Sequence, residues 1–402
     1  MSKPINADLV EAGWQDAARW LPSNLDALAQ ETSGFRRRRG VRSALDLVRI
    51  ALAYALLDLS LRSVSTWMAT HGLGDVSDVA VLGRLRRGAR FLEAIVAQML
   101  TRQLWQAPTA TLPYRVRLVD ATTVSAPGAE GTEWRLHVSY DAARGVVDGV
   151  TLTDVHGGEH LERATPQAGE ILVGDRGYAH AARIRTARAR GAHVVIRLGH
   201  SAVPLTDRTG APVDPLAFAR RKRPRAGRPP RVEATDVYLR DDSERTDPLR
   251  LIVVRKTAEA THRERERIRR EASRKGKAVT DRSLAAAAFA FLLTSLPADE
   301  VDAVTIAELY RVRWQIELNF KRWKSLLALD ALRAHDPDLA RAYLYAKLIA
   351  ALLADTLARA ARAFSPWGAP LSPHELEDLD LGPSGPRRRR RRIHSAPAIS
   401  RA

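Results

Sequence analysis

A chain of 402 residues with 45% hydrophobic residues can form two or three domains with buried cores, and the absence of cysteine excludes disulfides and thiolate-bound metals. The net charge of +18 and the pI near 10.8 predict a polyanionic partner, most commonly nucleic acid, although the charge could serve solubility alone. No apolar signal-peptide core or uninterrupted membrane-spanning stretch is present, so we expect a cytoplasmic protein with no membrane contacts.

Residues 1–108 are predicted to form an all-helical N-terminal domain that binds DNA. Apolar residues recur at helical spacing over residues 43–61. Residues 60–92 then predict a helix, a glycine-containing turn and a second helix that Ser77 could cap. Four arginines fall late in that second helix: Arg84, Arg86, Arg87 and Arg90. The pattern fits either a helix-turn-helix or an ordinary helical hairpin with a basic outer face, and the sequence leaves both open.

The pattern changes to period two after a linker near residue 110. Strands are predicted over residues 114–125, 133–141, 145–157, 169–174 and 192–199, with a helix over 179–191 before the last of them. Three hairpin-linked strands followed by a strand–helix–strand unit indicate a mixed sheet covered by helices. We assign residues 111–200 to the first part of an α/β core.

The rest of the chain first interrupts this core and then completes it. Residues 201–288 predict a basic, β-rich insertion, and residues 220–275 alone hold 19 Lys or Arg against 10 Asp or Glu. Residues 289–365 return to an apolar strand, one long helix over 299–329 and a further helix, forming the last part of the core. Residues 366–402 are rich in Pro, Gly and Arg, so we expect a basic disordered tail.

Two aspartates stand where a sheet places ligands. Asp120 lies inside the apolar strand RVRLVDATTV, where burying an unpaired carboxylate is costly. Asp175 follows the apolar strand ILVG and precedes a glycine turn, at the carboxyl end of a strand. Either acid alone could be structural, since an aspartate at a strand end often caps the next helix. Together with a third acid they could form a site for Mg²⁺ or Mn²⁺.

The third acid lies in a basic helical stretch, YRVRWQIELNFKRWKSL. At 100° per residue, one face of this helix carries Tyr310, Arg313, Glu317 and Lys324. A lone carboxylate among bases could be a surface ion pair of little energetic weight. It could also bind a divalent metal while the bases hold a phosphate backbone.

These residues resemble the signature of DDE transposases of the insertion-sequence type, in the subgroup called insertion-sequence family four. The subgroup signature Y-x2-R-x3-E-x6-K is matched at every fixed position by Tyr310, Arg313, Glu317 and Lys324. Asp120 of LVDATTV matches the family's first catalytic carboxylate, and Asp175 of VGDRGY matches the second within a D-x-G-Y pattern. The resemblance covers about residues 30–360.

The resemblance implies a ribonuclease-H-like mixed-sheet core, interrupted by the β-rich insertion, that cuts and joins DNA at the inverted repeats of a mobile element. Asp120, Asp175 and Glu317 would be catalytic and would bind two Mg²⁺ or Mn²⁺ ions. DNA would be held by Tyr310, Arg313, Lys324 and Arg176. The implied partners are double-stranded DNA, at the element ends and the target, and a second copy of the chain in a homodimer. The implied location is the bacterial cytoplasm, at the nucleoid.

Other interpretations remain at this point. The same three acids could serve a ribonuclease-H-like nuclease that cuts without strand transfer, and a domesticated or inactive copy could bind specific DNA without cutting it. A plain cationic structural protein would not need the complete acid set. The stretch DVHGGEH, with His156, Glu159 and His160, has weak metal-site spacing or is a polar turn. The insertion lacks the tryptophan that some family members use in hairpin formation, so that step stays open.

Overall fold

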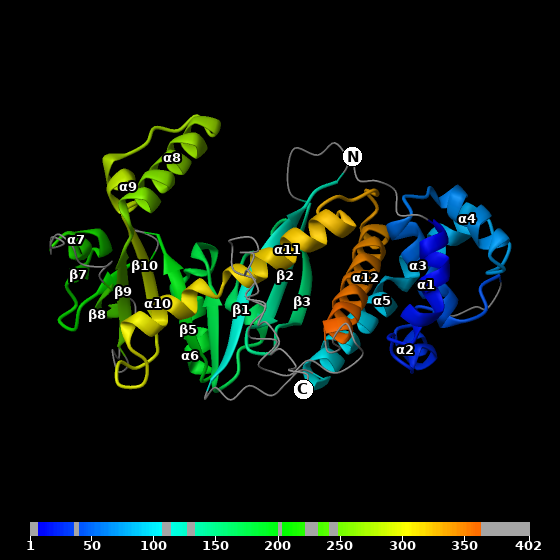
Figure 1. The fold of residues 1–402 in the computed structure, drawn as a ribbon, viewed down its shortest axis with the longest axis horizontal. Helices are drawn as coiled ribbons and strands as arrows, with labels where there is room; N and C mark the ends of the chain where they lie inside the picture. Colours follow the sequence, from blue (N-terminus) through cyan, green and yellow to red (C-terminus); the bar gives the residue numbers. More distant parts are fainter. Residues whose placement is uncertain are drawn as a thin grey trace, which may run out of the picture. The chain divides into compact units, whose positions relative to one another are not determined.

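The computed structural model describes residues 7–35, 40–106, 114–126, 133–199, 203–221, 232–240 and 248–362. The chain divides into two compact units, Met1–Leu353 and Ala354–Ala402, and the predicted tail lies outside the described residues. Figure 1 shows mixed α/β structure in the first unit. Within the described ranges, no helix combines the length and the apolar character that crossing a membrane requires.

A ten-stranded mixed sheet forms the centre of the first unit, in the order β3-β2-β1-β4-β5-β10-β9-β8-β6-β7. The strands are β1 (Arg115–Val124), β2 (Trp134–Asp141), β3 (Val146–Asp154), β4 (Glu170–Gly174), β5 (His193–Leu198), β6 (Leu205–Thr206), β7 (Pro212–Val213), β8 (Val232–Leu239), β9 (Leu249–Arg255) and β10 (Phe289–Thr294). The first three pair antiparallel as hairpins, whereas β4 runs parallel to β1 and β5 parallel to β4. The predicted mixed sheet is therefore confirmed.

The register between β1 and β4 places the two predicted aspartates beside each other. Leu118 pairs with Val173 in this parallel ladder. Asp120 lies two residues beyond Leu118, and Asp175 lies two residues beyond Val173. Because neighbouring strands are about 4.8 Å apart, matching positions on them bring their side chains close together.

The strands of the predicted insertion belong to the same sheet. β10 pairs antiparallel with β5 on one side and with β9 on the other. β9 in turn pairs with β8, which pairs with β6. The described strands between residues 203 and 255 therefore extend the sheet outward from β10.

Five helices, α1 to α5, precede the sheet in the described part of the chain, and the others lie between or after its strands. The helices are α1 (Ala7–Ala18), α2 (Leu25–Glu31), α3 (Ala44–Leu56), α4 (Leu61–Thr70), α5 (Asp78–Gln106), α6 (Ala181–Ala189), α7 (Pro215–Arg220), α8 (Ala258–Arg274), α9 (Asp281–Ala286), α10 (Ala303–Arg311), α11 (Trp314–Leu327) and α12 (Pro337–Arg362), with the 3₁₀ turns η1 (Leu161–Ala164) and η2 (Arg176–Tyr178). Both faces of β1 are covered. Leu118 belongs to one buried cluster with residues of α5, α11 and α12, and Val119 to a second cluster with Ile184 of α6.

The predicted N-terminal helices are present between residues 7 and 106. Ser43 and Asp46 form a capping box at α3, and Ser77 accepts a hydrogen bond from the Ala80 N–H at the start of α5, at 3.3 Å. The basic face of α5 is partly engaged within the protein, because Arg86 forms an ion pair with Asp336 just before α12, at 3.1 Å.

The prediction of a single long helix over residues 299–329 is wrong. The structure has α10 and α11, with a turn at Val312 and Arg313 in which hydrogen bonds span three residues, from the Arg313 N–H to the Tyr310 carbonyl and from the Ile316 N–H to the Arg313 carbonyl. The break follows the sheet, since α10 packs on β8 and β9 whereas α11 packs on β1 (Figure 1). Helical periodicity alone does not reveal such a turn.

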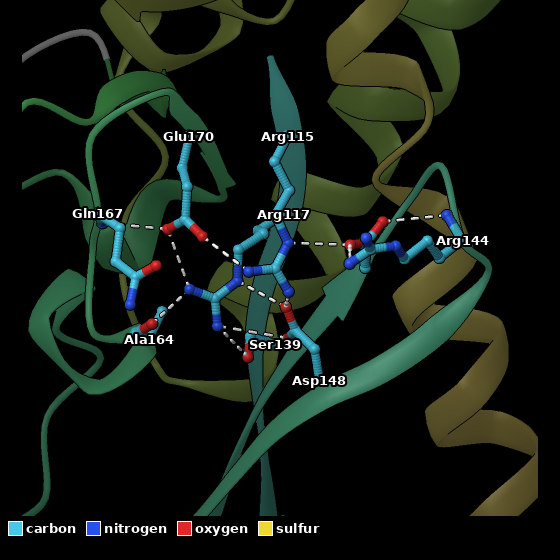
Figure 2. A network of polar contacts seen from close by, with 9 residues as sticks. Arg115, Arg117, Ser139, Arg144, Asp148, Ala164, Gln167 and Glu170 are labelled. Atoms are coloured by element: carbon cyan, nitrogen blue, oxygen red, sulfur yellow. Dashed lines mark hydrogen bonds and ion pairs between the residues drawn. The ribbon is translucent and has the colours of Figure 1, made fainter. Parts of the chain in front are cut away.

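A buried ion-pair network ties four strands together around the start of β1 (Figure 2). Arg115 contacts Asp141 at 2.9 Å, Asp148 at 2.7 Å and Glu170 at 2.9 Å. Arg117 contacts Asp148 at 2.7 Å and Glu170 at 3.1 Å. The Asp148 and Glu170 side chains are 0% and 3% exposed. The sequence suggested no such role for these residues, which fix β1 to its neighbours three residues before Asp120.

Lys347 is a second buried charge, in the middle of α12. The residue is 2% exposed, and its ammonium donates a hydrogen bond at 2.6 Å to the carbonyl of Ala328, the residue that ends α11 in a left-handed conformation. It also lies 4.3 Å from the centre of the Tyr343 ring. Burial lowers the pKa of Lys347 to about 8.

We expect the stability advantage of Lys347 over a neutral side chain to grow with pH. Between the folded pKa of about 8 and the ordinary value of about 10.4, the unfolded chain binds a proton at Lys347 that the folded chain does not. The unfolding free energy of the wild type relative to Lys347→Met should then rise by up to about 1.4 kcal/mol per pH unit in that window. Denaturant melts of both proteins across it measure the difference, and a flat difference would contradict the expectation.

Candidate active site

Asp120 is held in β1 with its carboxylate facing α11. Its side chain is 15% exposed, and one oxygen lies 3.2 Å from Nη1 of Arg313 while the other accepts the Ala121 N–H at 2.8 Å. Burial raises the pKa of Asp120 to about 7, and the neighbouring Asp175 and Glu159 add to the rise. The carboxylate is therefore ready to be neutralised by a cation or a proton.

Asp175 follows β4 and begins η2. Its Oδ1 accepts the Gly177 N–H at 2.8 Å, so it does cap the turn that follows the strand. Asp175 thus caps this turn and, from the same position, also raises the pKa of Asp120. The structure thus brings the two predicted aspartates together, as the parallel register requires.

Glu317 lies in the first turn of α11 and meets Asp120 through Arg313. The Arg313 guanidinium contacts Glu317 with Nη2 and Asp120 with Nη1. Burial alone would lower the pKa of Arg313, but Tyr310, Glu317 and Asp120 together raise it above its ordinary value. Arg313 is thus the cation that bridges the two carboxylates in this structure.

The other residues of the predicted signature surround this contact. Tyr310 lies at the end of α10 with its ring centre 5.7 Å from the Arg313 guanidinium, and its hydroxyl is buried without a hydrogen-bond partner. Lys324, in the last turn of α11, forms no ion pair with any residue that the structure describes. Arg176 is about half exposed and lies 4.0 Å from Glu264 of α8. Lys324 is therefore available to a ligand without breaking an ion pair, whereas Arg176 would have to leave Glu264.

Glu159 is a fourth carboxylate at the site, one that sequence reasoning grouped with histidines. Burial raises the pKa of Glu159, and Asp175 raises it further. Its carboxylate lies over Gly177, where an added Cβ would fall 1.5 Å from Oε2. A larger residue at position 177 would therefore require the Glu159 side chain to move. The DVHGGEH spacing singled out Glu159, but it grouped this residue with His156 and His160 and not with Asp175.

The donor set suits a hard divalent cation, since it offers carboxylate oxygens only. Among the residues that the structure describes, no group of three or more His, Asp or Glu side chains is close enough to hold an ion as they stand. The same holds for His156, Glu159 and His160, and the ring centre of His160 lies 6.3 Å from that of His180, edge to face. Burial raises the pKa of Asp120 and Glu159, and repulsion from neighbouring carboxylates raises it further; a bound cation would offset both effects.

Comparisons with known proteins place this geometry in a family. Residues 111–353 match the family described as Transposase DDE domain. The chain is 37% identical over 353 residues to the transposase for insertion sequence element IS421 of Escherichia coli, covering 87% of this chain and 94% of that protein. It is 38% identical over 352 residues to the protein named as transposase InsL for IS186A of Escherichia coli K12, with the same coverage. It is 24% identical over 376 residues to the transposase for IS231E of Bacillus thuringiensis subsp. finitimus, covering 83% and 76%.

Proposed function

This chain belongs to the DDE transposases of insertion sequences, and we propose that it cuts DNA at the inverted repeats of its element and joins the freed ends to target DNA with Asp120, Asp175 and Glu317. The observation that carries this assignment is the contact that Arg313 makes with both Asp120 and Glu317. It joins a sheet strand and a helix 193 residues apart in the sequence. Asp175 lies beside Asp120 through the strand register.

The family implies dependence on a divalent metal, and the three carboxylates would hold two Mg²⁺ or Mn²⁺ ions. Such ions activate the attacking oxygen and stabilise the leaving oxygen in an in-line displacement. Asp120 would supply a largely buried carboxylate, whose pKa is raised by burial and by the neighbouring Asp175 and Glu159. Glu317 is 46% exposed on its helix turn, so its side chain can turn from Arg313 toward Asp120. Glu159, whose pKa is raised by burial and by Asp175, would be a further carboxylate beside Asp175 at the metal site.

The bases beside the carboxylates would bind the DNA backbone. When the acids hold cations, Arg313 no longer has to neutralise them, and its guanidinium can bind a phosphate in bidentate fashion. Tyr310 would donate its unpartnered hydroxyl to the same strand. Lys324 and Arg176 would hold phosphates on either side of the cut.

The finer organisation is part of the same proposal. We assign a ribonuclease-H-like core to residues 111–200 and 289–365, the insertion to 201–288 and a DNA-binding function to the helices of 1–108. The family match begins at residue 111, at the predicted start of the core, which supports that boundary. The protein would act as a homodimer that holds two element ends, in a bacterial cytoplasm at the nucleoid.

Cleavage of a labelled duplex that carries the element end tests the proposed function. We expect nicks at the end of the inverted repeat that require Mg²⁺ or Mn²⁺ and do not occur in a duplex with a scrambled repeat. Binding without cleavage would favour the inactive DNA-binding protein. Cleavage at scattered positions would favour a nuclease.

Tyr310→Phe should separate activity from stability. The lost hydroxyl is buried without a partner, so removing it should leave the unfolding free energy unchanged or raise it by up to about 1 kcal/mol. If the hydroxyl binds the DNA strand, the same change should lower the cleavage rate roughly tenfold. Denaturant melts and single-turnover cleavage measure the two effects.

Tyr345→Phe is the matched control for that experiment. The Tyr345 hydroxyl donates to Glu93 at 2.6 Å, linking α12 to α5 away from the site. Its loss should lower the unfolding free energy by about 1 kcal/mol and leave cleavage by the folded protein unchanged. Equal effects of the two substitutions on cleavage would argue against a role for Tyr310 in DNA binding.

A further inference from the structure

A basic cluster of Arg176, Arg197 and Lys256 lies on the part of the sheet that β5, β10 and β9 form next to β4. Arg197 projects from β5, where it pairs across the ladder with Leu292 of β10. Lys256 directly follows β9, and its N–H donates to the Ala288 carbonyl at 2.9 Å. Burial lowers the pKa of Lys256, and Arg197 and Arg176 lower it further. The parallel pairing of Gly174 with Ile196 also sets the residues after β4, Asp175 and Arg176, beside Arg197.

One carboxylate reaches this cluster, from the charged helix α8. Glu264 is 15% exposed, accepts hydrogen bonds from Arg267 at 2.9 and 3.1 Å and lies 4.0 Å from Arg176. The Arg267 hydrogen bonds lower the pKa of Glu264 to about 2, and Lys256 and Arg197 contribute to this shift. Glu264 is therefore an anion held in a strongly positive environment.

Two of the bases are not satisfied by the protein. Nε of Arg197 is buried without a hydrogen-bond partner. The structure gives Arg197 and Lys256 no ion pair with any described carboxylate. Holding partly buried bases in this way is costly unless an anion joins them. A purely structural cluster would be expected to pair its charges, as the network at Arg115 and Arg117 does.

A groove leads from this cluster along α8 and α9. Its volume is about 320 Å³, and its charged lining consists of four bases and two acids: Arg176, Arg267, Lys275, Lys277, Glu264 and Glu271. None of the residues of α8 is buried, so the helix is held by few apolar contacts. Figure 1 shows α8 and α9 beside the end of β10. The groove begins at Arg176, the neighbour of Asp175 in the chain.

We propose that Arg176, Arg197 and Lys256 form a binding site for backbone phosphates of the DNA strand that reaches the active site, and that Glu264 occupies this site until DNA displaces it. The inference rests on the proposed function, since it takes DNA as the ligand. A phosphate supplies the negative charge that these bases lack as a partner. Its oxygens can accept the hydrogen bond that Arg197 Nε donates to no protein atom. Displaced from the cluster, Glu264 keeps Arg267 as its partner.

The test measures binding of the full chain to a labelled element-end duplex, with Ca²⁺ in place of Mg²⁺, over a series of salt concentrations. Lys256→Gln and Arg197→Gln should each weaken binding about three- to tenfold and reduce the slope of log affinity against log salt by about one. Glu264→Gln should tighten binding by about the same factor. Thermal melts of each variant establish that it is folded. Lys256 lies outside the strands, so Lys256→Gln tests the site even if Arg197→Gln disturbs β5.

Matched controls lie on the same helix. Glu266→Gln removes an acid that pairs with Arg269 at the surface, and Arg263→Gln removes a base that pairs with exposed Glu259. Both should leave affinity within about twofold of wild type. Equal effects of Glu264→Gln and Glu266→Gln, or an unchanged salt slope in Lys256→Gln, would overturn the inference while wild-type cleavage still upheld the proposed function. A wild type that neither binds nor cuts the duplex would overturn both.

Discussion

Replacing Glu317 by Gln is expected to lower metal-dependent cleavage of element-end DNA at least about 10³-fold while DNA binding stays nearly unchanged. Gln keeps the shape of the side chain but removes the charge that a divalent ion requires. Glu317 is 46% exposed on the first turn of α11, so the substitution should not disturb the fold. Asp120→Asn and Asp175→Asn should have losses of similar size. Single-turnover cleavage and a binding assay measure both quantities.

Glu308→Gln provides the matched control, because Glu308 is an exposed glutamate on the neighbouring helix α10. It should cut DNA at the wild-type rate. Equal cleavage by wild type and Glu317→Gln would show that a different carboxylate completes the site, for which Glu159 is the candidate because it acts on the pKa of Asp120. Loss of DNA binding in Glu317→Gln would mean that the residue acts on the fold or on the DNA.

Arg117→Met should lower the free energy of unfolding by about 3–5 kcal/mol. The substitution leaves Asp148 and Glu170, which are 0% and 3% exposed, without one of their two arginine partners. Breaking a buried pair from one side is costly because the remaining charge stays buried. Adding Glu170→Gln to Arg117→Met should recover part of the loss. Urea denaturation of the three proteins measures these differences.

Arg183→Met is the surface control for the network. Arg183 pairs with Glu162 at 2.9 Å with its own side chain 43% exposed, so its loss should lower the unfolding free energy by at most about 1 kcal/mol. If Arg117→Met were no more destabilising than Arg183→Met, the buried network would not be what fixes β1. In that case the position of Asp120 would depend on the apolar contacts of Leu118 and Val119.

The sequence predicted the elements that carry regular periodicity. The hairpins of β1 to β3, the strand–helix–strand unit of β4, α6 and β5, and the apolar strand β10 all lie where the pattern placed them. The sequence also predicted that Asp120 and Asp175 could belong to one acidic site, and the parallel register of β1 and β4 then sets the two positions side by side.

What the sequence did not predict depends on contacts between distant segments. The turn at Arg313 arises because α10 and α11 pack on different strands, which helical periodicity cannot express. Arg115 and Arg117 occur in an alternating strand, and only the pairing of four strands shows that acids from β2, β3 and β4 surround them. Glu159 and Glu264 reach their sites from a loop and a helix whose placement follows no local pattern.

Joining of a precut element end to target DNA tests the central claim most directly. A duplex that ends in the free 3′ hydroxyl of the inverted repeat is mixed with the full-length protein, Mg²⁺ and a supercoiled target plasmid. We predict covalently joined product with wild type and none with Glu317→Gln, although both proteins bind the duplex. Stable binding by wild type without joined product, or joining by Glu317→Gln at the wild-type rate, would contradict the account.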